Sequence, residues 1–106
     1  MTAPLFIIGA GGFGREVFSL IQALKRAADA PHPTGFIDDD PNAADLELLE
    51  ALGSRLVGSV DDLIRRTEPF SAVLAIGSAS GREAIASRLA HSPVTYPVLV
   101  HPDATI

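Results

Sequence analysis

The sequence predicts an α/β domain with a small Rossmann-like, three-layer fold and a parallel sheet of about five strands. Three observations predict it. Apolar runs and helical patterns alternate along the 106 residues, a length typical of one domain. The first apolar run, residues 5–8, does not alternate with polar residues, as is typical of a strand buried on both faces. A glycine-rich turn follows at once and leads into a helical pattern.

Two helices and two further strands are expected in the rest of the first half. The first helix ends near Asp29, before two prolines. A second strand covers residues 34–37, a short helix covers residues 45–52 and stops at Gly53, and a third strand covers residues 55–58. The predicted inward side chains are Phe13, Val17, Leu20, Ile21, Leu24 and Ala28 in the first helix, and Leu46, Leu49 and Leu52 in the second.

The second half repeats the alternation. Ser59 is expected to cap a helix that runs through Arg66, with two aspartates in its first turn. The fourth strand, residues 72–76, is entirely apolar. Residues 80–83 form a capping-box pattern for a helix that reaches about His91. A fifth strand over residues 97–100 and a tail over residues 101–106 follow.

The predicted topology brings three loops together. Right-handed crossovers between parallel strands place helices on both faces of the sheet. A strand order of 3-2-1-4-5 puts a switch point between the first and fourth strands, and ligands bind there outside the carboxyl ends of the strands. The glycine loop 9–14, the turn 38–40 and the loop 77–80 would line one crevice at this point.

The glycine loop is the first candidate site. Gly9, Gly11 and Gly14 match the G-x-G-x-x-G pattern between a strand and a helix. Glycines allow a tight bend and close approach of a pyrophosphate, and the helix start offers unpaired N–H groups. The pattern therefore indicates a phosphate-bearing ligand without identifying it. The alternative is a tight turn that packs the helix on the sheet and binds nothing. Arg15 could reach a phosphate or be a solvated surface charge.

The acidic turn after the second strand is the second candidate. A carboxylate of Asp38 or Asp39 could accept hydrogen bonds from ribose hydroxyls or a base N–H. The alternative is local turn chemistry before Pro41, which we favour for Asp40.

A second glycine turn, Gly77 and Ser78, precedes the fourth helix. It repeats the anion-binding geometry of the first, although an ordinary capping box explains it equally well. Arg82 in the first turn opposes the helix dipole, which favours a purpose beyond helix stability.

Composition narrows the range of functions. A net charge of −5 argues against nucleic-acid binding, and the absence of cysteine excludes disulfides and thiolate metal sites. The sequence begins with no basic leader and holds no apolar run long enough for a membrane span, so a soluble, cytoplasmic domain is expected. Neither a metal-ligand set nor a Ser/His/Asp set is evident. We therefore expect a binding module with no catalytic residue and no metal of its own.

Five segments occur in a characteristic order: residues 9–16 (GAGGFGRE), 36–41 (FIDDDP), 58–63 (GSVDDL), 75–77 (AIG) followed by Arg82, and 101–106 (HPDATI). Together they resemble the N-terminal domain of bacterial nucleotide-sugar acyltransferases. These are the sialic acid O-acetyltransferase-like enzymes and the N-acetyltransferases that act on UDP-amino-sugars or on GDP-perosamine.

The resemblance implies a nucleotide-sugar-binding domain over residues 1–100 and the start of a left-handed β-helix acyltransferase domain over residues 101–106. In this family the β-helix forms a trimer, binds acetyl-CoA and supplies the catalytic histidine. The expected ligand is a UDP- or GDP-linked amino or deoxy sugar of bacterial surface glycan biosynthesis. This fragment would then be monomeric, without a cofactor of its own and inactive alone.

Residue roles follow from the matched motifs alone. The resemblance implies that Gly11, Gly12, Phe13 and Gly14 face the sugar and phosphates, that Asp38 and Asp39 face the nucleoside, and that Gly77 and Ser78 line the pyrophosphate side. Some members have His at the position of Phe13 and Asn-Asn at the position of Ser78-Ala79. Either departure could alter the sugar or base preferred.

Two other functions remain open at this stage. The G-x-G-x-x-G pattern and a later aspartate also suit an NAD-type domain of an oxidoreductase. A non-catalytic regulatory domain that binds a nucleotide is the third hypothesis.

Overall fold

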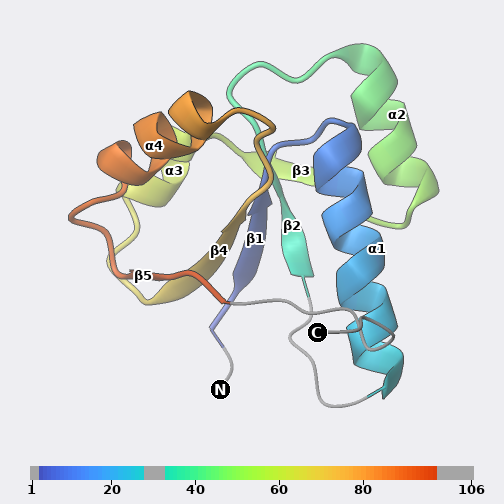
Figure 1. The fold of residues 1–106 in the computed structure, drawn as a ribbon, viewed down its shortest axis with the longest axis horizontal. Coiled ribbons are helices and arrows are strands. Elements are labelled where there is room, and N and C mark those ends of the chain that lie inside the picture. Colours follow the sequence, from blue (N-terminus) through green and yellow to red (C-terminus); the bar gives the residue numbers. More distant parts are fainter. Residues whose placement is uncertain (1–2, 28–32, 98–106) are drawn as a thin grey trace.

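The computed structural model describes residues 3–27 and 33–97, in which strands and helices alternate strictly (Figure 1). In chain order the elements are β1 (Leu5–Ile8), α1 (Gly12–Ala27), β2 (Pro33–Ile37), α2 (Ala43–Ala51), β3 (Leu56–Gly58), α3 (Val60–Ile64), β4 (Phe70–Leu74), α4 (Ala79–Arg88) and β5 (Val94–Thr95). The predicted α/β class is confirmed.

The sheet has five parallel strands in the order β3-β2-β1-β4-β5. This is the predicted order, so the switch point lies between β1 and β4. Figure 1 shows α1 and α2 on one face and α3 and α4 on the other, which makes the predicted three layers. Ile8 pairs with Ile37 of β2 and with Leu74 of β4, so these three strands end at one level.

β1 lies between two separate hydrophobic cores. Its residues point alternately to the two faces of the sheet: Ile7 packs in the core beneath α1 and α2, and Ile8 packs in the core beneath α3 and α4. Because helices cover both faces, every position of β1 is apolar and buried. The unbroken apolar run in the sequence is thereby explained.

The buried stripe of α1 differs from the predicted one at three positions. Val17 and Ile21 are buried as predicted, and Phe18 is buried although it was not predicted, whereas Phe13 is exposed and Leu20 is half-buried. The stripe begins at Gly14, where a Cβ atom would collide with the carbonyl oxygen of Gly9. A hydrophobicity pattern misses this start because Gly14, which packs against Gly9, has no side chain.

α2 buries one leucine rather than three. It begins at the N-cap Asn42, whose side chain accepts a hydrogen bond from the Asp45 N–H at 2.8 Å. Leu49 is buried, whereas Leu46 and Leu52 are exposed, contrary to the prediction. This short helix lies toward the edge of the sheet and turns only one row of side chains inward. Gly53 follows it with φ +79°, as expected of a glycine that stops a helix.

β4 and α4 both begin two residues earlier than predicted. β4 covers Phe70–Leu74, and the apolar run continues past the strand because Ala75 is buried in the loop. Ser78, rather than Ser80, is the N-cap of α4, and its hydroxyl accepts a hydrogen bond from the Gly81 N–H at 3.1 Å. In α3, by contrast, the predicted cap is confirmed, with Ser59 and Asp62 forming a capping box.

The fifth strand also begins earlier than predicted. β5 is Val94–Thr95 and pairs with the start of β4, where the Phe70 N–H donates to the carbonyl oxygen of Pro93 at 3.0 Å. Pairing therefore starts directly after the turn that follows α4. Pro97, the first residue of the predicted strand, is not in a strand. Residues 98–100 lie outside the described residues, as do the side chain of Leu24, the residues Ala28 and Asp29, and the tail 101–106.

Candidate functional site

The loops that follow β1, β2 and β4 meet at the carboxyl ends of the strands, as the topology predicted. The Gly9 N–H donates to the carbonyl oxygen of Ile37 at 2.7 Å, which joins the first two loops. The Ala75 N–H donates to the carbonyl oxygen of Ile8 at 2.8 Å, which brings in the loop after β4. Residues far apart in the sequence therefore share one end of the sheet.

A cavity of ≈ 120 Å³ opens between these loops and the helices α3 and α4. Its lining comprises Ile8, Gly9, Ile37, Asp38, Asp39, Val60, Ile76 and Ile85. Three predicted site residues, Gly9, Asp38 and Asp39, line it. Val60 and Ile85 were not predicted to line the site, because an apolar residue on a helix is equally consistent with a place in the hydrophobic core.

The glycines of the site fall into two groups. Gly9 has φ +117°, and a Cβ there would lie 2.5 Å from the carbonyl oxygen of Ala75. Gly14 packs against Gly9, so the fold itself requires glycine at both positions. Gly11 and Gly77 are different: a Cβ at either would meet nothing within 4 Å, and neither has a positive φ. At Gly12 a Cβ would meet only the Arg15 side chain, at 3.8 Å.

The start of α1 carries free hydrogen-bonding capacity. Asn42, Ser59 and Ser78 cap the other three helices with their side chains. Gly11, which precedes α1, has no side chain to do so, and the first turn of α1 contains no acidic residue. The N–H groups in the first turn of this 16-residue helix therefore have no acceptor on a side chain of Gly11, and they point out of the end of the helix.

Asp38 connects the acidic turn to the glycine loop. Its Oδ2 atom accepts a hydrogen bond from the Ala10 N–H at 2.9 Å, and its Oδ1 atom accepts one from the Asp40 N–H at 2.9 Å. The second bond is the local turn chemistry considered as the alternative. Each carboxylate oxygen can still accept another hydrogen bond, so a role for Asp38 toward a ligand stays a prediction.

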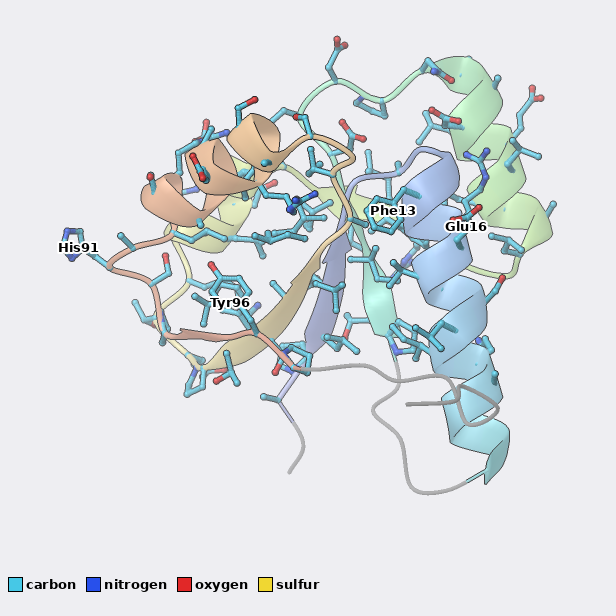
Figure 2. The ribbon with its side chains drawn as sticks, viewed as in Figure 1. Phe13, Glu16, His91 and Tyr96 are labelled. Carbon is cyan, nitrogen blue, oxygen red and sulfur yellow. The ribbon has the colours of Figure 1, made fainter. Side chains whose placement is uncertain are left out.

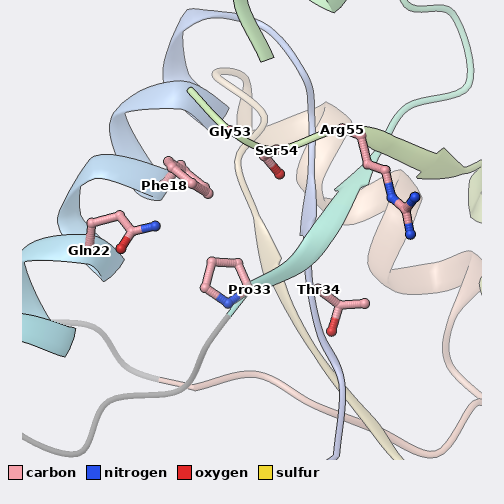
Figure 3. Close-up of a pocket in the computed structure, with 7 residues that line it drawn as sticks. All are labelled: Phe18, Gln22, Pro33, Thr34, Gly53, Ser54 and Arg55. Carbon is pink, nitrogen blue, oxygen red and sulfur yellow. The ribbon is translucent and has the colours of Figure 1, made fainter. Parts of the chain in front are cut away.

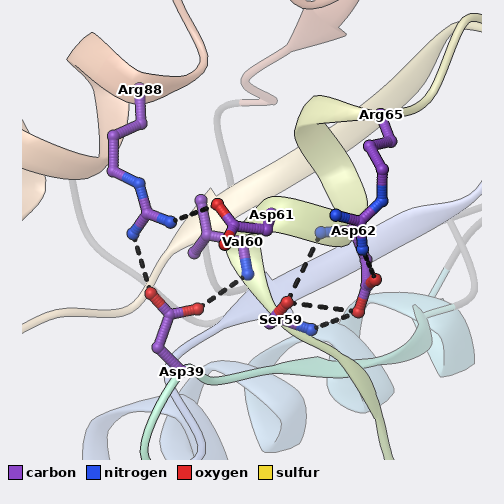
Figure 4. Close-up of polar contacts among 7 residues, drawn as sticks. All are labelled: Asp39, Ser59, Val60, Asp61, Asp62, Arg65 and Arg88. Atoms are coloured by element: carbon purple, nitrogen blue, oxygen red, sulfur yellow. Dashed lines mark hydrogen bonds and ion pairs between the residues drawn. The ribbon is translucent and has the colours of Figure 1, made fainter.

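Asp39 holds two helices in place (Figure 4). Its Oδ1 atom accepts from the Val60 N–H at the start of α3 at 2.8 Å, and its Oδ2 atom pairs with Nη1 of Arg88 on α4 at 2.7 Å. Nη2 of Arg88 reaches Asp61 at 2.9 Å. The Arg88 guanidinium and the Val60 N–H hold the pKa of Asp39 below its usual value, and the two carboxylates raise the pKa of Arg88. The role of Asp39 toward a nucleoside stays a prediction.

Two further arginines contact the site loops. Nη1 of Arg15 donates to the carbonyl oxygen of Ala10 at 3.2 Å and pairs with Asp45 of α2 at 2.7 Å. Nη1 of Arg82 donates to the carbonyl oxygen of Ile76 at 2.9 Å, which fixes a positive charge beside the loop after β4.

A larger cavity, ≈ 210 Å³, lies at the opposite end of the sheet (Figure 3). It is lined by Phe18, Gln22, Pro33, Thr34, Gly53, Ser54 and Arg55. It contains none of the predicted site residues and lies by the start of β2 and the segment before β3. Ligands of parallel α/β sheets bind at the carboxyl ends, so the smaller cavity is the better candidate.

Neither a metal centre nor a membrane span is found in the part of the chain that the structure describes. Over residues 3–27 and 33–97 no three His, Asp or Glu side chains gather where they could hold a metal ion. No helix in the same ranges has both the length and the apolar character to cross a bilayer.

Comparison with known proteins identifies one family. A family model described as the PglD N-terminal domain matches residues 4–89. The matched range runs from β1 to the end of α4 and includes every candidate site residue. No curated protein matches the chain.

Proposed function

Because the chain belongs to the PglD N-terminal domain family, the N-terminal domain of PglD-like nucleotide-sugar acetyltransferases, we propose that it binds the nucleotide-sugar substrate of such an enzyme. The proposed substrate is a UDP- or GDP-linked amino or deoxy sugar of bacterial surface glycan biosynthesis. The proposed reaction, acetyl-CoA-dependent N- or O-acetylation in the cytoplasm, would take place in a partner domain.

The observation that carries this proposal is the open space at Gly11 and Gly77. Neither a positive φ nor a neighbouring atom requires glycine at either position, so backbone strain and close packing do not account for these residues. A pyrophosphate that approaches the backbone closely does account for them, because any side chain would stand in its way. The N–H groups at the start of α1 would then bind the phosphates.

The remaining residues complete the proposed site. Asp38 and Asp39 line the cavity beside Gly9 and would accept hydrogen bonds from the nucleoside. Gly77 and Ser78 would line the pyrophosphate side, and Arg82 would add a positive charge there. Gly12, Phe13 and Gly14 would lie nearest the phosphates and sugar.

Calorimetry with a UDP-sugar, a GDP-sugar, CMP-sialate and NAD tests the proposal. We expect one nucleotide-sugar to bind and NAD not to bind. Gly11→Ala and Gly77→Ala should each lower the affinity about tenfold while the protein stays folded, because the added methyl group occupies ligand space. Ser19→Ala, an exposed position on α1, is the matched control and should change nothing.

Tight NAD binding without nucleotide-sugar binding would instead assign the chain to the dinucleotide-binding class. Binding of free nucleotides with no contribution from any sugar would favour a regulatory domain. Unchanged affinity in both glycine variants would remove the glycine loops from the site.

We also propose that this domain works joined to a left-handed β-helix that trimerises and holds acetyl-CoA. Residues 1–106 alone should then sediment as a monomer. A stable trimer of this domain in sedimentation velocity would refute this proposal.

A further inference from the structure

The side chain of Arg15 lies between two helices instead of extending into solvent. In Figure 2 the first turn of α1, marked by Phe13 and Glu16, lies beside α2. Nη1 of Arg15 pairs with Oδ1 of Asp45 there at 2.7 Å, and the two side chains are only 25% and 23% exposed. The same nitrogen donates to the carbonyl oxygen of Ala10 at 3.2 Å. A partly buried ion pair therefore joins α1 to α2 and holds one carbonyl group of the glycine loop.

The bond to the Ala10 carbonyl sets the direction of the next N–H group. The carbonyl of Ala10 and the N–H of Gly11 belong to one planar trans peptide, in which the two groups point in opposite directions. With the carbonyl turned toward Arg15, the Gly11 N–H points away from the guanidinium. Within residues 3–27 and 33–97 this N–H donates to no acceptor, and a Cβ at Gly11 would meet no atom within 4 Å. An unpaired donor on an open backbone is thus fixed in direction.

The preceding peptide of the loop, between Gly9 and Ala10, is held as well. Its N–H donates to Oδ2 of Asp38 at 2.9 Å. Its carbonyl oxygen packs so closely against Gly14 that a Cβ there would collide with it. Two consecutive peptides are therefore held by groups from α1, α2 and the turn after β2. Such a loop is ordered before any ligand arrives, which removes part of the ordering cost of binding.

We propose that Arg15 and Asp45 are positioning residues that present the Gly11 N–H to a phosphate oxygen of the nucleotide-sugar. This role rests on the proposed function. Asp45 holds the guanidinium, the guanidinium holds the Ala10 carbonyl, and the rigid peptide passes this constraint to the N–H. Neither side chain has to touch the ligand. Without the ion pair the peptide can rotate, and binding must then also order it.

A direct contact between Arg15 and the phosphate predicts the opposite effect of a change at Asp45. Removing a negative charge near a bound anion favours binding on electrostatic grounds, and it releases the guanidinium for that contact. If the pair instead positions the loop, Asp45→Asn weakens binding, because Arg15 loses the partner that holds it. The sign of the change in affinity therefore separates the two roles.

NMR titrations of the chain with UDP, GDP, uridine and guanosine test the proposal. Arg15→Ala and Asp45→Asn should each weaken the diphosphate that wild type binds by about three- to tenfold, and the corresponding nucleoside by less than about twofold. The double variant should bind no more weakly than Arg15→Ala alone, because the two residues act through one interaction. The Gly11 amide proton should shift downfield with the diphosphate in wild type and less in either variant. Glu47→Gln removes the same charge from an exposed position on α2 and is the matched control.

Three results would overturn the positioning role while the proposed function stands. Unchanged or tighter diphosphate binding by Asp45→Asn, with a loss in Arg15→Ala, would assign Arg15 to direct contact with the phosphate. Equal losses for nucleoside and diphosphate would reduce the ion pair to general support of the fold. Unchanged affinity in both variants would remove the pair from the site. If wild type binds neither UDP nor GDP, the proposed function fails first, and the positioning role fails with it.

Discussion

The carboxylate of Asp38 accepts a hydrogen bond from the Ala10 N–H across 2.9 Å, and this bond joins the turn after β2 to the glycine loop after β1. The two residues are 28 positions apart in the sequence. Parallel pairing of β1 with β2 brings them together, because Ile8 and Ile37 are register partners at the strand ends. One carboxylate thus shapes the loop that we propose to hold the phosphates.

Replacing Asp38 should therefore affect stability as well as binding. Asp38→Ala leaves the Ala10 and Asp40 N–H groups without this acceptor, and we expect the free energy of unfolding to fall by about 1–2 kcal/mol. Binding of the nucleotide-sugar should weaken by a further 1–3 kcal/mol, roughly, if the carboxylate contacts it. Urea denaturation and calorimetry separate the two effects. Asp40→Ala is the matched control, and equal destabilisation by both variants would contradict the proposed linkage.

Alanine substitutions at the two kinds of glycine should differ in their effect on stability. Gly14→Ala forces a methyl group against the Gly9 carbonyl oxygen and should destabilise the fold by about 1–3 kcal/mol. Gly11→Ala places its methyl group in open space and should cost only about 0.5–1 kcal/mol, the difference between glycine and alanine at the position before a helix. Thermal and urea unfolding of both variants measure the difference. Similar stability of the two variants would show that α1 does not pack as closely on the loop as described.

The N-cap of α4 can be tested with two neighbouring serines. Ser78→Ala removes the hydroxyl that accepts from the Gly81 N–H and should cost about 1 kcal/mol of unfolding free energy. Ser80 lies inside the first turn, so Ser80→Ala should leave stability nearly unchanged. A larger loss of stability from Ser80→Ala than from Ser78→Ala would show that Ser80 is the N-cap, as the sequence pattern predicted.

Asp39 should make stability depend on pH. Its pKa is lower in the folded protein than its ordinary value of 3.8, first because Arg88 donates a hydrogen bond to it and also because the Val60 N–H does. The stabilisation is present above the ordinary pKa and is lost as the pH falls through the lowered one. Asp39→Asn should thus be less stable than wild type at pH 7, and the gap should narrow below about pH 4.

The effect should be small because the Asp39 side chain is 45% exposed. At neutral pH we expect a difference under about 1 kcal/mol. Unfolding free energies of both proteins between roughly pH 2 and 7 provide the measurement, with Asp40→Asn as the control. A gap that stays constant through this range would exclude the Asp39 carboxylate as its source.

Particular residues show how far the sequence could predict the fold. The apolar run at residues 5–8 and the cap at Ser59 are local signals, and the structure confirms both. Phe13 and Leu46 were expected to point inward because the patterns count every apolar residue as core, yet both are exposed. Burial depends on which flank of a helix meets the sheet, and a glycine such as Gly14 can mark that flank without any hydrophobic signal.

By itself the sequence determined the class of fold, because periodicity, caps and glycine spacing are local signals. The strand order usual for that class then predicted that three loops meet at one end of the sheet. The tertiary structure decided which glycines serve the fold and which leave open space. It also decided that Asp39 pairs with Arg88 and that Phe13 stays exposed. These relationships join residues distant in sequence, and they exist only after the sheet has brought their strands together.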